Sequence, residues 1–100
     1  MNRKKVEKYL ADTVGIDVAY RGFDVLVDCI LLVSKDVTKY RQGYTTKLFD
    51  EILALPRYSD NSKMQISSWL VRTVKTAANN KYKNLSAKKF IFLAVIEIGG

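Results

Sequence analysis

A polar stripe between Lys63 and Asn79 holds the side chains of this chain that are best suited to chemistry. Gln65, Ser68 and Arg72 are three and four residues apart, so they would share one face of a helix. A glutamine amide can pair with adenine, a serine hydroxyl can donate to a base or a phosphate, and an arginine fork can bind guanine or phosphate. These residue types at this spacing predict a surface that reads a nucleic acid by hydrogen bonding.

The charge distribution favours the same interpretation. The net charge is +7, and residues 61–100 carry most of it, with seven Lys or Arg residues against one carboxylate, Glu97. We expect a positive potential there that attracts a polyanion, with nucleic acid as the first candidate. The lysines suited to nonspecific phosphate contact are Lys63, Lys75, Lys81 and Lys83. Lysine-rich surfaces also serve solubility alone, and that alternative stays open.

Catalytic and metal chemistry have little support. The chain has no histidine and one cysteine, Cys29, so it lacks the usual zinc ligands and the common bases for a Ser or Cys nucleophile. It also lacks a glycine-rich nucleotide motif. We therefore expect no enzyme, no metal and no cofactor. Cys29 has apolar neighbours and is expected to be an inert core residue.

Asp24 and Asp28 are four residues apart on an expected helix. This spacing could bring two carboxylates together for acid and base chemistry. A solvated helix face is the simpler interpretation, since no feature of the sequence marks either side chain as buried.

The periodicity of apolar residues predicts an all-α fold, a single domain over residues 1–100 with five to six helices. A first helix over about 3–14 can end at Gly15 in the left-handed conformation, and 23–34 has the pattern of a central core helix. Residues 35–44 form a connection with room for one helical turn. Ser86 can cap a last helix.

The centre of the chain predicts a helix-turn-helix, with helices over about 46–55 and 63–79. Thr45 or Thr46 can cap the first of these helices, Pro56 disfavours its continuation, and Ser62 can cap the second. In the second helix, Trp69 falls on the apolar face. Packing in the core is its favoured role, and stacking on a base is the alternative.

The longest apolar stretch is too short to span a bilayer as a helix, and the N-terminus lacks the apolar region of a signal peptide. We expect a soluble, cytoplasmic protein that does not enter a membrane.

Several of these residues form a pattern that resembles a known family. The pattern begins with a Gly-aliphatic pair and a basic-Gly-aromatic helix start, and apolar positions of later helices follow. The matching residues are Gly15, Ile16, Arg21, Gly22, Phe23, Leu26, Asp28, Cys29, Ile30, Val33, Asp36, Leu48, Phe49, Ile52, Phe90, Ile91 and Leu93. The chain thus resembles the C-terminal DNA-binding domain of the response regulator that initiates sporulation in spore-forming bacteria.

The resemblance implies about six helices and a recognition helix, here 63–79, that enters the major groove of DNA. Gln65 and Ser68 stand where the family usually has arginines, and Ser67 stands where it has a glutamate, so we expect a different operator sequence. The turn, with Pro56, is also longer than in the family. We expect no phosphorylated receiver domain, so control of that kind would be absent or supplied by another protein.

Two hypotheses follow. In the first, the protein binds duplex DNA and regulates transcription, and the DNA-binding residues are Lys63, Gln65, Ser67, Ser68, Arg72 and Lys75. In the second, it is a protein-interaction module that kept the fold and lost DNA reading. Its partner would then be a full-length regulator or a second copy, bound through the last helix. No small-molecule substrate is expected in either case.

Overall fold

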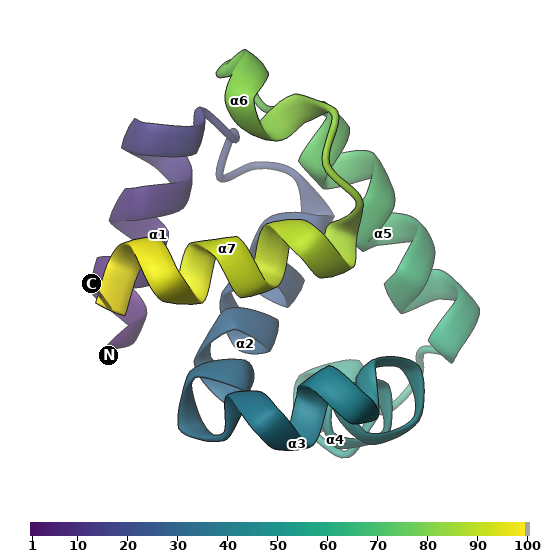
Figure 1. Ribbon diagram of the computed structural model, residues 1–100. Helices are drawn as coiled ribbons and strands as arrows, with labels where there is room; N and C mark the ends of the chain where they lie inside the picture. Colours follow the sequence, from purple (N-terminus) through teal and green to yellow (C-terminus); the bar gives the residue numbers. More distant parts are fainter. Residues whose placement is uncertain (100) are drawn as a thin grey trace.

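Helices make up all the regular structure of residues 1–99, the part of the chain that the computed structural model describes (Figure 1). They are α1 (Arg3–Lys8), η1 (Tyr9–Val14), α2 (Arg21–Lys35), α3 (Val37–Gln42), η2 (Tyr44–Leu48), α4 (Phe49–Leu53), η3 (Pro56–Tyr58), α5 (Lys63–Lys75), α6 (Asn80–Lys83) and α7 (Ala87–Gly99). The expected all-α class is confirmed. In the described part there are seven α-helices rather than five or six, because two expected connections contain the short helices α3 and α6.

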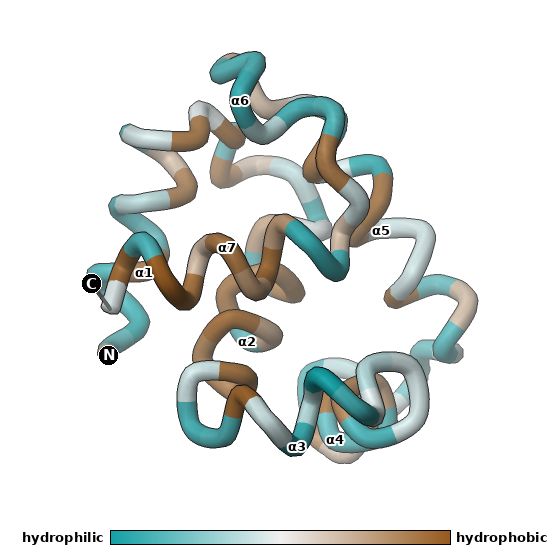
Figure 2. Tube along the Cα trace, viewed as in Figure 1, coloured by the Kyte–Doolittle hydropathy of each residue, from teal (hydrophilic) through white to brown (hydrophobic). Residues whose placement is uncertain are grey.

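The central element of the core is α2, as its apolar pattern predicts. Nine of its fifteen residues are buried, among them Phe23, Leu26, Val27 and Ile30. It packs against α5 and α7, and Figure 2 shows hydrophobic residues concentrated along α2 and α7. Cys29 lies in this core, and burial raises the pKa of its thiol, as expected for an unreactive cysteine.

The first helical segment ends where the sequence predicts. The helices α1 and η1 follow one another without a break, and Gly15 then adopts a φ of 82°, in the left-handed region that favours glycine. The backbone N–H groups of Gly15 and Ile16 both donate to the carbonyl oxygen of Leu10, at 3.0 and 2.9 Å. These bonds provide donors for a carbonyl group in the last turn of the helix, and the chain then turns toward α2.

The helix-turn-helix region differs from the prediction at its first helix. The chain becomes helical at Tyr44, and the N-cap is Gly43, which provides no side-chain hydrogen bond. The expected caps at Thr45 and Thr46 are therefore wrong, since both residues lie inside η2. The continuous segment of η2 and α4 ends at Leu53, and a short turn of helix at Pro56–Tyr58 follows.

The start of α5 agrees with the prediction, and its end does not. The Ser62 side chain accepts a hydrogen bond from the backbone of Gln65, as expected for the cap. The helix ends at Lys75 instead of Asn79. Its continuation is lost because the N–H groups of Ala78 and Asn79 donate to Gly15 and Val14, at 3.1 and 3.2 Å, and not to carbonyls of their own helix.

The last helix, α7, is capped by Ser86 as predicted, since the Ser86 hydroxyl accepts from the N–H of Lys89 at 3.2 Å. Close to its end, Glu97 receives hydrogen bonds from Tyr9 and Tyr82, each at 2.6 Å, and from Lys81. Burial opposes ionisation of this carboxyl, but the three donors prevail and lower its pKa to about 2. Glu97 thus joins the two ends of the chain, which lie side by side in Figure 1.

No helix within residues 1–99 has both the length and the apolar character needed to cross a membrane.

Asp28 corrects the sequence-based interpretation of the Asp24–Asp28 pair. Asp24 is solvent-exposed as expected, but the Asp28 carboxylate is buried on the core helix. Its Oδ1 accepts from Arg3 at 2.7 Å and its Oδ2 from the Tyr58 hydroxyl at 2.6 Å, while Arg57 lies 3.4 Å away. A buried charge of this kind requires such partners. The carboxylate therefore links α2 to the N-terminal helix and to the turn before α5.

The crossing of α2 and α5 depends on Gly22. A Cβ atom at this position would lie 2.0 Å from Thr73 Oγ1 and 2.6 Å from the carbonyl oxygen of Trp69. Only a residue without a side chain allows the two helices to approach this closely.

We predict that Gly22→Ala lowers the free energy of unfolding by about 1–3 kcal/mol, because the added methyl group overpacks the crossing. Gly99→Ala is the control, since a Cβ atom there has no neighbour closer than 3.9 Å. Urea unfolding followed by circular dichroism measures both variants. Equal stability of the two would contradict the close approach.

We also predict that Asp28→Asn lowers the free energy of unfolding by about 1–3 kcal/mol, because a neutral amide leaves two arginines without their buried charge partner. The matched control is Asp24→Asn, whose side chain is 64% exposed and should change stability by less than about 0.5 kcal/mol. The same unfolding experiment applies, and similar losses in both variants would show that burial of Asp28 has no particular effect.

Candidate nucleic-acid interface

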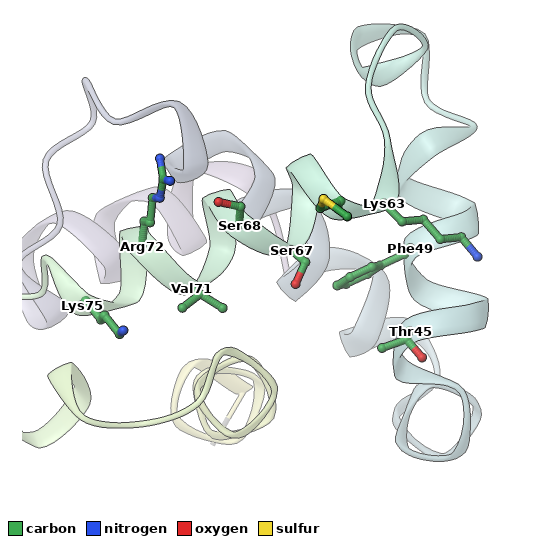
Figure 3. Close-up of a pocket in the computed structure, with 9 residues that line it drawn as sticks. Thr45, Phe49, Lys63, Ser67, Ser68, Val71, Arg72 and Lys75 are labelled. Carbon is green, nitrogen blue, oxygen red and sulfur yellow. The ribbon is translucent and has the colours of Figure 1, made fainter.

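The helix α5 has one buried and one open face. Ile66, Leu70, Thr73 and Val74 are buried against the core. The opposite face borders an open groove with a volume of about 680 Å³ (Figure 3). The groove is lined by Thr45, Phe49, Lys63, Met64, Ser67, Ser68, Val71, Arg72 and Lys75.

Five of the six predicted DNA-binding residues lie in this groove. They are Lys63, Ser67, Ser68, Arg72 and Lys75. Figure 3 shows Ser67 and Lys75 on one edge of α5, with Val71 between them, and Ser68 and Arg72 on the other edge. The structure therefore brings these side chains together on a single helix, at the spacing that the sequence indicates.

Gln65 is the exception among the six. Its side-chain oxygen accepts from the backbone N–H of Ser62 at 3.0 Å and from the Asn61 amide at 3.3 Å, so the residue completes a capping box. Bidentate pairing with adenine needs the same oxygen as an acceptor. The base-reading role expected for Gln65 thus competes with the role that its side chain has in the structure.

The opposite wall of the groove is formed by η2 and α4. Thr45 and Phe49 line it, and the ring of Phe49 lies 5.2 Å from that of Tyr44. Burial raises the pKa of the Tyr44 phenol, which therefore stays neutral. The ammonium group of Lys88, at the start of α7, lies 5.9 Å from the Tyr44 ring and adds a positive charge near this wall.

The cations of the groove differ in their partners. Lys63 pairs with Asp50 at 2.7 Å, which offsets its charge. Within residues 1–99, Arg72 and Lys75 have no ion-pair partner, and both are exposed. Of the other lysines expected to contact phosphate, Lys81 pairs with Glu97 and Lys83 has no ion-pair partner in the same range. The C-terminal half of α5 is accordingly the more positive end.

Trp69 does not face the groove. It is half-buried against the core, as predicted, and the guanidinium of Arg21 lies 5.3 Å from the centre of its ring. In this position it has a packing role and no access to a base beside Ser67 or Val71.

Two apolar residues of the groove are missed by the sequence reasoning. Met64 is 81% exposed and Val71 is 41% exposed, although both are hydrophobic. The sequence does indicate their position, because Met64 and Val71 are seven residues apart and their spacing places both on the polar face of the helix. An apolar residue on a polar face is informative only when the structure shows that nothing covers it.

The connection between the two helices is longer than in a typical helix-turn-helix. α4 ends at Leu53 and α5 begins at Lys63, whereas the motif commonly uses a turn of about 3–4 residues. The intervening segment contains η3, whose Tyr58 is hydrogen-bonded to Asp28. This segment is therefore held against the core.

No family model, curated protein or solved structure matches the chain. Within residues 1–99, no group of Cys, Asp and Glu side chains could hold a metal ion.

We predict that Gln65→Ala lowers the free energy of unfolding by about 0.5–1 kcal/mol, because the Ser62 N–H loses its acceptor. Gln65→Glu is the matched control, since glutamate at this position also completes a capping box and suits the positive end of the helix dipole. Chemical denaturation distinguishes the two variants. A Gln65→Ala variant as stable as the parent would mean that the capping box contributes nothing.

Proposed function

We propose that this protein binds duplex DNA through the open face of α5 and regulates transcription. The main support is that five residues predicted from the sequence line one groove, and that two of these five, Arg72 and Lys75, have no ion-pair partner in the described part of the chain. In this proposal the chain acts in the cytoplasm as a divergent relative of the sporulation regulator's DNA-binding domain, which its sequence resembles.

The dimensions of α5 suit the major groove. The helix has 13 residues and a length of about 20 Å. An α-helix is about 10–12 Å wide with its side chains, and the major groove of B-DNA is about 12 Å wide. One or two turns of α5 could therefore lie against base edges while its ends reach the phosphates.

The side chains have separate roles in this arrangement. Arg72 and Lys75 neutralise phosphates and position the helix. Ser67 and Ser68 contact base edges as hydrogen-bond donors or acceptors. Lys63 contributes less, because Asp50 already neutralises it.

A protein-interaction module is the second candidate. The observation that favours it is an apolar surface on α7, where Ile96 is 67% exposed and Phe92, Leu93 and Val95 are only partly buried. Such a surface could pair with a second copy or with a full-length regulator.

We expect a labelled duplex of mixed sequence to bind at low micromolar protein in low salt, as measured by fluorescence anisotropy. Arg72, Lys75, Lys83, Lys88 and Lys89 have no ion-pair partner within residues 1–99. If all five contact phosphates, the plot of log K against log salt should have a slope of about −4 to −5.

Lys75→Ala should weaken binding to every sequence and reduce the salt slope by about 1. Lys4→Ala is the control, since Lys4 is exposed on α1, at the other side of the molecule (Figure 1). Absence of binding by the parent protein would reject the DNA proposal. A dimer mass in light scattering, together with that absence, would support the interaction module.

A further inference from the structure

The groove beside α5 has an apolar centre as well as basic edges. Met64 and Val71 project from the open face of the helix, and both are more exposed than the rest of the apolar residues of α5. Phe49 and the methyl-bearing Thr45 line the same groove from the facing wall. If this face meets DNA, a polar base edge covered by these apolar atoms would lose its hydration without gaining a hydrogen bond, whereas an apolar group would lose nothing.

The major groove offers one group of that kind. Among the edges of the four base pairs, only thymine presents an apolar methyl group, at C5. Side chains that end in methyl groups recognise it by contact and burial, without a hydrogen bond.

The spacing along α5 fits more than one such contact. Met64 and Val71 are seven residues apart, about two helical turns or about 10 Å along the axis. Successive base pairs are about 3.4 Å apart, so this separation corresponds to about three base pairs when the helix lies along the groove. The polar atoms of Ser67 lie between the two apolar positions and can meet an intervening base edge.

We infer that this surface selects thymine, with Met64 and Val71 packing against the C5 methyl groups of two thymines about three base pairs apart. The inference rests on the proposed DNA binding and specifies what the site would recognise. The basic edges provide the charge complementarity for the duplex, because Arg72 and Lys75 flank the apolar centre without ion-pair partners in the described residues.

The test begins with a pool of duplexes with randomised centres, from which the bound fraction is selected and sequenced. The best duplex is then prepared in two forms, one with thymine and one with deoxyuridine, which differ only by the methyl groups. Burial of one methyl group corresponds to about a fourfold change in affinity. We expect the deoxyuridine form to bind about 4-fold to 15-fold more weakly, depending on whether one or both contacts form.

The variants identify the side chains responsible. In Met64→Ala and Val71→Ala, the ratio of the two affinities should fall toward 1, whereas Met64→Leu should retain it. Lys75→Ala is the control, because it should weaken both forms equally and leave the ratio unchanged. Both alanine substitutions lie on an exposed helix face, where alanine is the most favourable residue, and circular dichroism verifies folding.

The possible outcomes separate this inference from the proposed function. No selection of any duplex would overturn both. Selection of duplexes that bind equally well with thymine and deoxyuridine would overturn the inference alone. A ratio that survives both alanine substitutions would show that other residues contact the methyl groups, and would also overturn it.

Discussion

The close crossing of α2 and α5 at Gly22 sets the orientation of the α5 residues in the candidate interface. Since Gly22 has no side chain, Thr73 and the Trp69 backbone of α5 can lie directly against α2. This contact directs Ile66 and Leu70 into the core, and the helical period then leaves the opposite stripe open. A bulkier residue at position 22 would displace α5 and with it the α5 wall of the groove.

The buried Asp28 network has a complementary effect on the segment before α5. Its carboxylate is bonded to Arg3 and Tyr58, so the N-terminal helix and the turn at η3 share one anchor on α2. The long connection between α4 and α5 would otherwise be free to vary in conformation. Because Tyr58 is hydrogen-bonded to Asp28, the start of α5 at Lys63 has a defined position relative to the core, as the proposed contact with bases would require.

Features that depend on local chemistry could be predicted from the sequence. The apolar period of α2, the left-handed Gly15 and the caps at Ser62 and Ser86 all follow from residue type and spacing. Features that depend on distant partners could not. Burial of Asp28 requires Tyr58, 30 residues away, and the early end of α5 results from bonds to Val14 and Gly15.

In the candidate site, too, local features could be predicted from the sequence and contacts between distant elements could not. The helical stripe that carries Ser68, Arg72 and Lys75 could be predicted, because it needs only the period of one helix. The ion pair of Lys63 with Asp50 could not be predicted, because it joins two different helices. The sequence also places Gln65 on the open stripe, whereas in the structure its side chain caps α5. The apolar centre formed by Met64, Val71 and Phe49 emerges only when η2 and α4 are placed beside α5.

We propose that the open face of α5 is the surface that binds DNA, and the other parts of the proposal depend on this contact. The most direct measurement is an NMR titration of the ¹⁵N-labelled protein with a short duplex, which reports on every backbone amide. If the open face of α5 binds the duplex, the largest shift changes should fall within 63–75 and at Thr45 and Phe49, with little change in α1. Changes centred on α1 or on the C-terminal half of α7, or none at all, would contradict it.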